Sequence, residues 1–156
     1  MNRKLPGTLN IYKKSGAVQF TLIPPRWSNP VEDKSLRLDK NGSILLEVAK
    51  GLGEKSYAWE EKINIALGIN DIMIIFDNPD RPAKLIHDTP NSPLMKTLEF
   101  VPGEEKYKGT YMMKLSETNQ ETNASRFLQV PLSGGEYFVL QKLLLDMLPK
   151  MVGWVE

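Results

Sequence analysis

The residues of this chain that could do chemistry are lysines and arginines interleaved with aromatic rings, and they lie between positions 12 and 62. Cationic side chains bind phosphates and aromatic rings stack on unpaired bases, so this mixture is typical of a surface for single-stranded nucleic acid. We expect one such surface in the first half of the chain. Its candidate residues are Tyr12, Lys13, Lys14, Phe20, Arg26, Trp27, Lys34, Arg37, Lys40, Tyr57, Trp59 and Lys62.

Charge is distributed unevenly along the chain. Its 20 basic and 19 acidic residues give a net charge of +1, so bulk positive charge cannot be what recruits nucleic acid. Residues 1–40 carry eight basic and three acidic residues, a net of +5, whereas residues 41–80 carry three basic and seven acidic residues, a net of −4. A basic face near the N-terminus is therefore the electrostatic sign of a polyanion ligand. An ordinary solvated surface, with the aromatic rings in the core, is the alternative.

Catalytic and metal chemistry lack the residues that they need. The chain has no cysteine, which excludes thiolate zinc sites, iron–sulfur clusters and cysteine nucleophiles. Its one histidine, His87, is followed by Asp88 but by no further ligand, and the sequence has neither a P-loop nor a nucleophile elbow. We therefore predict no catalytic residue, no metal site and no cofactor. His87 is interpreted as a structural hydrogen-bonding residue at the end of a strand.

The sequence also bears on the compartment. No apolar run approaches the roughly 20 residues of a transmembrane helix, and no apolar signal segment follows the basic start. We expect a soluble protein of a reducing compartment. The candidates are the cytoplasm or nucleoid, the host cytoplasm if a phage encodes the chain, and an organelle if the chain is a trimmed mature form.

The elements that must position the candidate residues are mostly β-strands. Alternation of polar and apolar residues predicts, in the first half, strands over 8–13, 17–23, 35–39, 43–49 and 57–67, followed by a short helix over 70–76. Lys14-Ser15-Gly16 is typical of a hairpin turn. Lys40-Asn41-Gly42 predicts a tight turn, because Asn-Gly tolerates positive φ.

The second half repeats this plan. Strands are predicted over 84–87, 94–101, 109–116 and 126–130, followed by a helix over 134–148. Ser133 and Glu136 have the spacing of a capping box, and Pro149 is expected to end or kink the helix. The pattern is a run of strands followed by a helix, twice over, which predicts an α+β fold in a single domain spanning 1–156.

The last predicted helix carries more apolar residues than one packing face needs. A helix on one sheet buries a stripe of about 100°. Here the apolar residues nearly encircle the helix: Tyr137, Phe138, Val139, Leu140, Leu143, Leu144, Leu145, Met147 and Leu148. We predict a homo-oligomer held by this helix, and a helix buried within a single subunit is the alternative.

Several segments, taken in order, resemble the Whirly family of single-stranded-DNA-binding proteins. Residues 12–18 are similar to its Lys-Gly-Lys-Ala-Ala-Leu signature, although Lys13-Lys14-Ser15-Gly16 departs from the Lys-Gly-Lys spacing. Residues 38–46 resemble its Lys-Asp-Gly turn with the apolar strand that follows. Four further segments resemble motifs of the family. Residues 57–62 are similar to its Tyr-Asp-Trp-x-x-Lys segment and residues 86–88 to its Phe-His-Asp. Residues 130–132 resemble its C-terminal proline segment, and residues 148–154 its Leu-Pro-x-x-x-Gly-Trp.

The resemblance implies two antiparallel four-stranded β-sheets packed crosswise, with C-terminal helices that assemble a tetramer. It also implies that single-stranded DNA runs across the sheet edges with little sequence preference. The plant members' organellar transit segment is missing, which indicates a prokaryotic, phage or trimmed mature form.

Two other functions stay open at this point. A related fold carries the transcriptional positive-cofactor family and mitochondrial guide-RNA-binding proteins, so RNA binding or annealing is one alternative. A structural assembly subunit whose sheets bind protein is the other. The sequence does not distinguish DNA from RNA, since the 2′-OH is read by individual hydrogen bonds. Nor does it distinguish replication, recombination, repair and transcription.

Overall fold

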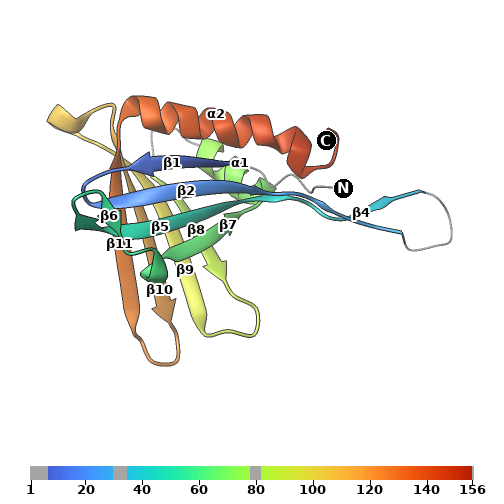
Figure 1. The fold of residues 1–156 in the computed structure, drawn as a ribbon, viewed down its shortest axis with the longest axis horizontal. Coiled ribbons are helices and arrows are strands. Elements are labelled where there is room, and N and C mark those ends of the chain that lie inside the picture. Colours follow the sequence, from blue (N-terminus) through green and yellow to red (C-terminus); the bar gives the residue numbers. More distant parts are fainter. Residues whose placement is uncertain (1–6, 30–34, 78–81, 156) are drawn as a thin grey trace.

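Two antiparallel β-sheets cross at a steep angle, and a long helix runs along the strands of the first sheet and across one end of the second (Figure 1). The computed structural model describes residues 7–29, 35–77 and 82–155. The first sheet contains β1 (Thr8–Tyr12), β2 (Gly16–Ile23), β5 (Ser43–Gly53) and β7 (Ile63–Leu67), in that order. A short strand, β6 (Ser56–Tyr57), pairs with the far end of β5.

The second sheet is a meander of four strands, ordered β11-β10-β9-β8. Its members are β8 (Ala83–Asp88), β9 (Leu94–Pro102), β10 (Tyr111–Asn119) and β11 (Ser125–Leu132). The 3-10 turns η1 (Trp59–Glu61) and η2 (Glu105–Tyr107) lie between strands. The predicted α+β class with two crossed antiparallel sheets is confirmed, although the extended segment expected over 57–67 divides into β6, η1 and β7.

A two-stranded arm extends the first sheet beyond its body (Figure 1). Its strands are β3 (Arg26–Ser28) and β4 (Arg37–Lys40), which pair with each other. β3 continues the course of β2, and β4 leads into β5, which pairs with β2 rather than with β4. The tight turn predicted at Lys40-Asn41-Gly42 is therefore wrong, because β4 runs on into β5 and the two strands pair with β3 and β2 respectively.

Gly42 is needed at this junction for a close approach rather than for a turn. Its φ is not positive, and a Cβ there would lie 2.6 Å from the carbonyl oxygen of Ile23 and 3.2 Å from Cα of Met151. The Gly42 amide donates to the carbonyl oxygen of Met151 at 2.8 Å. The base of the arm is thereby bonded to the last turn of the long helix.

The core lies between the two sheets and under the helices. Alternate residues of β5 (Ile44, Leu46 and Val48) and the matching residues of β9 and β10 point into it and are almost fully buried. Helix α1 (Ile69–Asp77) adds Ile72 and Ile75 from one face. The helix predicted over 70–76 is confirmed although its composition is β-prone, because Gly68 precedes it and the Gly68 amide donates to Asp71 Oδ2 at 2.8 Å.

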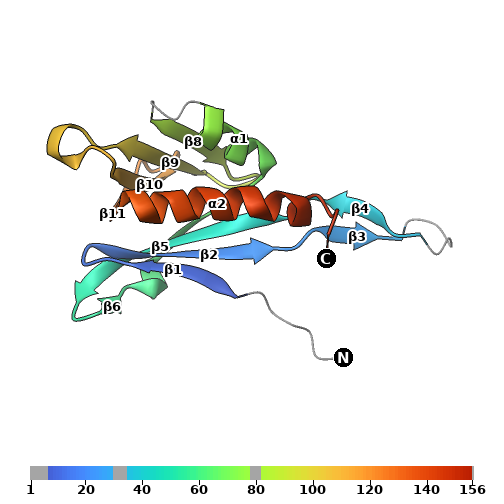
Figure 2. The ribbon, with the colours of Figure 1, turned by 90° about the horizontal axis from the view of Figure 1, so that it is seen from above.

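Helix α2 (Gly134–Met151) lies between the sheets in the view of Figure 2. The predicted capping box is present: the Ser133 side chain accepts from the Glu136 amide, and Glu136 Oε1 accepts from the Ser133 amide. The helix continues past Pro149, contrary to the expected end at 148. Proline removes one helical hydrogen bond, but Met151 is fully buried and its carbonyl accepts from Gly42, which holds the last turn in place.

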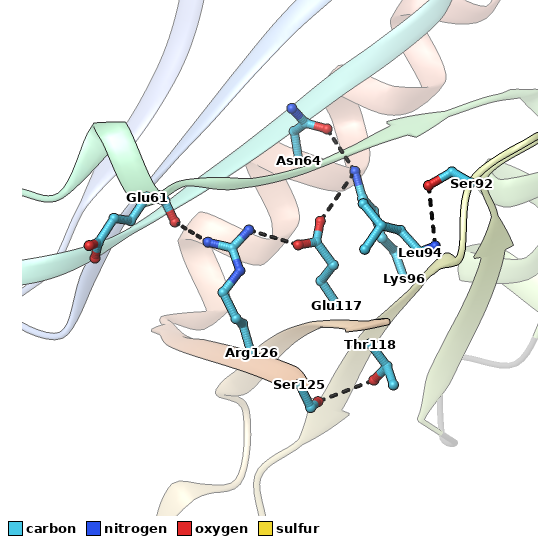
Figure 3. Close-up of polar contacts among 9 residues, drawn as sticks. All are labelled: Glu61, Asn64, Ser92, Leu94, Lys96, Glu117, Thr118, Ser125 and Arg126. Atoms are coloured by element: carbon cyan, nitrogen blue, oxygen red, sulfur yellow. Dashed lines mark hydrogen bonds and ion pairs between the residues drawn. The ribbon is translucent and has the colours of Figure 1, made fainter. Parts of the chain in front are cut away.

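A polar bridge joins the two sheets at one corner (Figure 3). Arg126 of β11 donates to the carbonyl oxygen of Glu61 and to Glu117 Oε1, both at 2.8 Å. Lys96 of β9 donates to Asn64 Oδ1 of β7 at 2.9 Å, and its Nζ lies 3.8 Å from Glu117 Oε2. One carboxylate of the second sheet thus orients two cations, of which Lys96 bonds to the first sheet and Arg126 to the η1 turn that precedes β7.

Candidate nucleic-acid interface

Three aromatic side chains meet where the first sheet turns. Tyr12 ends β1, Tyr57 ends β6 and Trp59 begins η1. The Tyr12 and Tyr57 rings have centroids 5.6 Å apart, and the Tyr57 and Trp59 rings 6.5 Å apart. The Tyr57 hydroxyl donates to the carbonyl oxygen of Lys13 at 3.0 Å, which fixes its ring against the β1–β2 turn. Tyr12 remains 59% exposed, so a flat ligand can reach its ring.

These rings line an open hollow of about 740 Å³. We call it the aromatic hollow; it is lined by Tyr12, Lys13, Lys14, Gly53, Glu54, Lys55, Ser56, Tyr57 and Trp59. Its walls combine stacking surfaces with ammonium groups. That combination binds the bases and the phosphates of a single strand together.

Gly51 lets the two turns that border the hollow come together. A Cβ at Gly51 would lie 2.2 Å from the carbonyl oxygen of Lys14, and the Gly51 amide donates to the carbonyl oxygen of Ser15 at 3.0 Å. Glu54, Lys55 and Ser56 were not among the residues predicted from the sequence. A Gly-x-x-Ser segment beside a strand, with a lysine inside it, was the available signal for this hairpin.

The lysines around the hollow differ in their electrostatic partners. Lys13 Nζ lies 2.5 Å from Glu136 Oε1 at the start of α2. Partial burial acts to raise the pKa of Glu136, but hydrogen bonds from Lys13 and Ser133 outweigh it and hold that pKa below its ordinary value. Lys62 is similarly paired with Glu47. Lys14 and Lys55 form no ion pair with any residue in the described ranges, so their charges are available to a phosphate.

The arm carries a second group of candidates, at the opposite end of the first sheet from the aromatic hollow (Figure 1). Arg26, Trp27, Arg37 and Lys40 all lie on β3 or β4. Arg26 Nε donates to Asp39 Oδ2 at 2.6 Å. Lys34, a further candidate, lies outside the described residues. The structure therefore divides the single surface expected from the sequence into two separate groups.

Trp27 is held by the C-terminal segment. A Cβ on Gly153 would lie 2.5 Å from the Trp27 ring, so the ring packs directly over that glycine. Trp27 and Trp154 border a hollow of about 550 Å³ together with Lys150. Trp154 is 82% exposed and was not among the predicted binding residues.

Phe20 does not belong to either group. It is 2% exposed and packs in the core on the inner face of β2. Its place in the strand's apolar alternation, with Val18 and Leu22, was the signal for burial. The prediction that Phe20 contacts nucleic acid is therefore wrong for this fold.

His87 takes part in a pair that holds an element in place. Its Nε2 lies 2.8 Å from Asp71 Oδ1, and the other oxygen of Asp71 caps the start of α1. Among the described residues, no three or more histidine, aspartate or glutamate side chains are grouped so as to hold a metal ion. Nor does any helix of the described ranges have the length and apolarity to cross a membrane.

Comparison with known proteins places these features in a family context. The family model described as Whirly transcription factor matches residues 11–143. WHY2, a mitochondrial single-stranded DNA-binding protein of Arabidopsis thaliana, is 22% identical over 93% of this chain and 62% of its own length. WHY1, a chloroplastic single-stranded DNA-binding protein of Zea mays, is 24% identical over 93% of this chain and 56% of its own. The chain thus spans about three fifths of the length of these curated relatives.

Solved structures share the fold over nearly the whole chain. The crystal structure of WHY1 from Arabidopsis thaliana has a TM-score of 0.89 at 22% identity and covers 99% of this chain and 89% of that one. The plant transcriptional regulator PBF-2 has a TM-score of 0.85 at 23% identity and covers 98% of this chain and 94% of that one. At these identities the likeness is one of fold.

Proposed function

The chain belongs to the Whirly family, and from that premise we propose that it binds single-stranded DNA through contacts that every sequence can make. The observation that supports this best is the aromatic hollow. There, Tyr12 and Tyr57 offer ring faces beside Lys14 and Lys55. Stacking is tolerant of sequence because every base has a π-face, and ammonium groups bind the backbone whatever the base.

The pairing of the lysines supports a division of roles. Lys14 and Lys55 supply the phosphate contacts, since the described residues provide them with no ion pair. Lys13 and Lys62 are each already bound to a carboxylate. A phosphate would have to displace that carboxylate, so we assign Lys13 and Lys62 a smaller share of the affinity.

The arm is proposed as a second, separate contact. Arg37 and Lys40 are exposed cations on β4, and Trp27 is 43% exposed beside Trp154. The two groups lie at opposite ends of the first sheet (Figure 1). A strand that reaches both would therefore follow the length of the sheet.

We further propose that α2 assembles the protein into a homo-oligomer, with a tetramer as the expected form. The side chains of Phe138, Val139 and Leu145 are 67%, 51% and 43% exposed in the protomer. Burying such side chains contributes about 1.5–3 kcal/mol each. The protein then acts as a non-enzymatic, single-domain DNA-binding subunit. The names of its relatives suggest an organelle as its compartment.

Fluorescence anisotropy tests the proposal directly. The probes are labelled single-stranded DNA, duplex DNA and single-stranded RNA of one sequence, each at two salt concentrations. We expect the tightest binding to single-stranded DNA and an affinity that falls with salt, because phosphate contacts release counterions. Tighter binding to RNA would favour the RNA-binding alternative. Failure to retain any oligonucleotide would overturn the proposal in favour of a structural assembly subunit.

A further inference from the structure

We propose that the aromatic hollow prefers guanine over the other bases, and that the carboxylate of Glu54 is the group that reads it. This inference rests on the proposed binding of single strands at the same hollow. It adds a graded preference at one nucleotide position to contacts that are otherwise shared by all sequences.

The turn that carries Glu54 is built from residues that are unusual at its positions. Gly53 pairs with Ser56, so Glu54 and Lys55 form a two-residue hairpin loop between β5 and β6. Their φ values are 45° and 60°. Loops with positive φ at both central positions favour Asn-Gly, Asp-Gly or Gly-Gly, since other side chains are strained there. Two long charged side chains held in this strained conformation beside a hollow indicate a use for those side chains.

The negative charge of Glu54 is also unexpected on a surface proposed to bind phosphates. It is exposed and lines the hollow, and it forms neither an ion pair nor a side-chain hydrogen bond within the described ranges. Two other carboxylates of this region are paired with lysines, Glu136 with Lys13 and Glu47 with Lys62. A carboxylate repels the phosphates of a strand, so its presence among lysines lowers affinity unless it accepts hydrogen bonds from the base.

Guanine is the base whose chemistry fits a carboxylate acceptor. Its Watson–Crick edge presents two adjacent N–H donors, the ring N1–H and the exocyclic N2 amine, which match the two oxygens of one carboxylate. On the same edge, adenine and cytosine each have a single donor group, the exocyclic amine, and thymine has a single donor, the ring N–H. Unstacked bases of single strands are commonly read on this edge while their rings stack on aromatic side chains. Here Tyr12 or Tyr57 supplies the ring, and Lys14 and Lys55 neutralise the phosphate.

Competition binding with three single-stranded DNA repeats of about 12 nucleotides tests this. They alternate thymidine with deoxyguanosine, deoxyinosine or deoxycytidine. Inosine keeps N1–H but lacks the exocyclic amine. We expect the wild-type protein to bind the guanine repeat roughly five- to tenfold more tightly than the cytosine repeat, with the inosine repeat between them.

The informative variants are Glu54→Asn and Glu54→Gly, because both residues suit a positive φ and leave the turn intact. We expect each to bind all three repeats with similar affinity, and to bind the cytosine repeat more tightly than wild type does, since a negative charge is gone. Glu60→Asn is the matched control: it removes an exposed carboxylate of η1 that does not line the hollow. It should keep the guanine preference.

The outcomes separate the two proposals. Equal wild-type affinity for the three repeats would overturn the guanine preference while leaving single-strand binding in place. A preference that survives in both Glu54 variants would overturn the role of Glu54. Absence of binding to every repeat would overturn the proposed function and, with it, this inference.

Discussion

Lys13 Nζ lies 2.5 Å from Glu136 Oε1, so the turn that borders the aromatic hollow is tied to the first turn of α2. The same oxygen of Glu136 accepts from the Ser133 amide, which closes the capping box. One carboxylate therefore joins the predicted nucleic-acid contact to the helix that we expect to hold the oligomer. We therefore expect Lys13 to act mainly as a structural residue.

Two adjacent lysines should consequently fail in different ways. Lys14→Ala should weaken binding to all sequences and reduce the slope of log affinity against log salt by nearly one unit, because one phosphate contact is lost. Lys13→Ala should chiefly lower the melting temperature and change that slope less. Titrations at several salt concentrations, with Lys84→Ala on the second sheet as a control for lost charge, measure both effects. An equal change of slope in the two variants would contradict this assignment.

Glu136 should make stability depend on pH in the acidic range. Its pKa in the folded protein lies below the ordinary value of 4.5. The unfolded chain therefore takes up the proton first as pH falls, so the contribution of Glu136 is complete above pH 4.5 and is lost below it. Glu136→Gln can keep the capping hydrogen bond but loses the negative charge beside Lys13 and the helix N-terminus. Urea unfolding of wild type and Glu136→Gln should therefore differ at neutral pH by about 0.3–1 kcal/mol, the usual value of such a charge. The difference should shrink as the pH falls below 4.5; a constant difference would count against this account.

The contributions of the Tyr57 ring and of its hydroxyl to DNA binding should be separable by mutation. Tyr57→Ala should lose roughly 1–3 kcal/mol of binding free energy if a base stacks there, with little change in salt slope. Tyr57→Phe keeps the ring and loses only the hydrogen bond to Lys13, so its affinity should stay close to wild type. Anisotropy and thermal melting are measured on the same samples, with Tyr107→Ala as an exposed aromatic control. If Tyr57→Ala lowers the melting temperature alone, the ring is structural.

The exposed face of α2 should control assembly. Phe138 and Leu145 lie two turns apart on one face, and Phe138→Asp or Leu145→Asp should give a smaller species in light scattering that remains folded. Leu144 is fully buried within the protomer, so Leu144→Asp should unfold the chain rather than only dissociate it. A wild-type protein that is already monomeric would disprove assembly through this face.

The sequence pattern predicts where the strands and helices lie better than it predicts which elements pair with one another. Alternation locates β5 and β9, and the capping box locates the start of α2, because these signals are local. The pairing of β4 with β3 is different, since local alternation does not say which strand is the partner, and the neighbouring Gly42 bonds to Met151, which is more distant in the sequence than any turn rule covers. Pro149 is a similar case. A proline is expected to end a helix, but here the buried Met151 holds the last turn in place and the helix continues.

The candidate site was predicted in part, for a similar reason. Residue types alone select Tyr12, Lys14, Tyr57 and Trp59, which the structure brings together. Residue type cannot tell Phe20 in the core from an exposed ring, nor Lys13 with its partner from Lys14 without one among the described residues. The candidates divide into a hollow and an arm because β2 with β3, and β5 with β4, form a long pair of strands that separates the two groups. Glu54 was missed because an acid is not expected where a polyanion binds.

The place of α2 has a consequence for how the chain folds as it leaves the ribosome. The first sheet is synthesised early, yet α2, the last described element, lies against its inner side, and the Gly42–Met151 bond seats the base of the arm. Until that helix emerges, the apolar side chains that face it, such as Phe20 and Leu22 of β2, lack its cover. Long-range pairings of this kind make folding slow and leave intermediates prone to aggregation. A nascent chain stalled before α2 is therefore the form that most needs a chaperone.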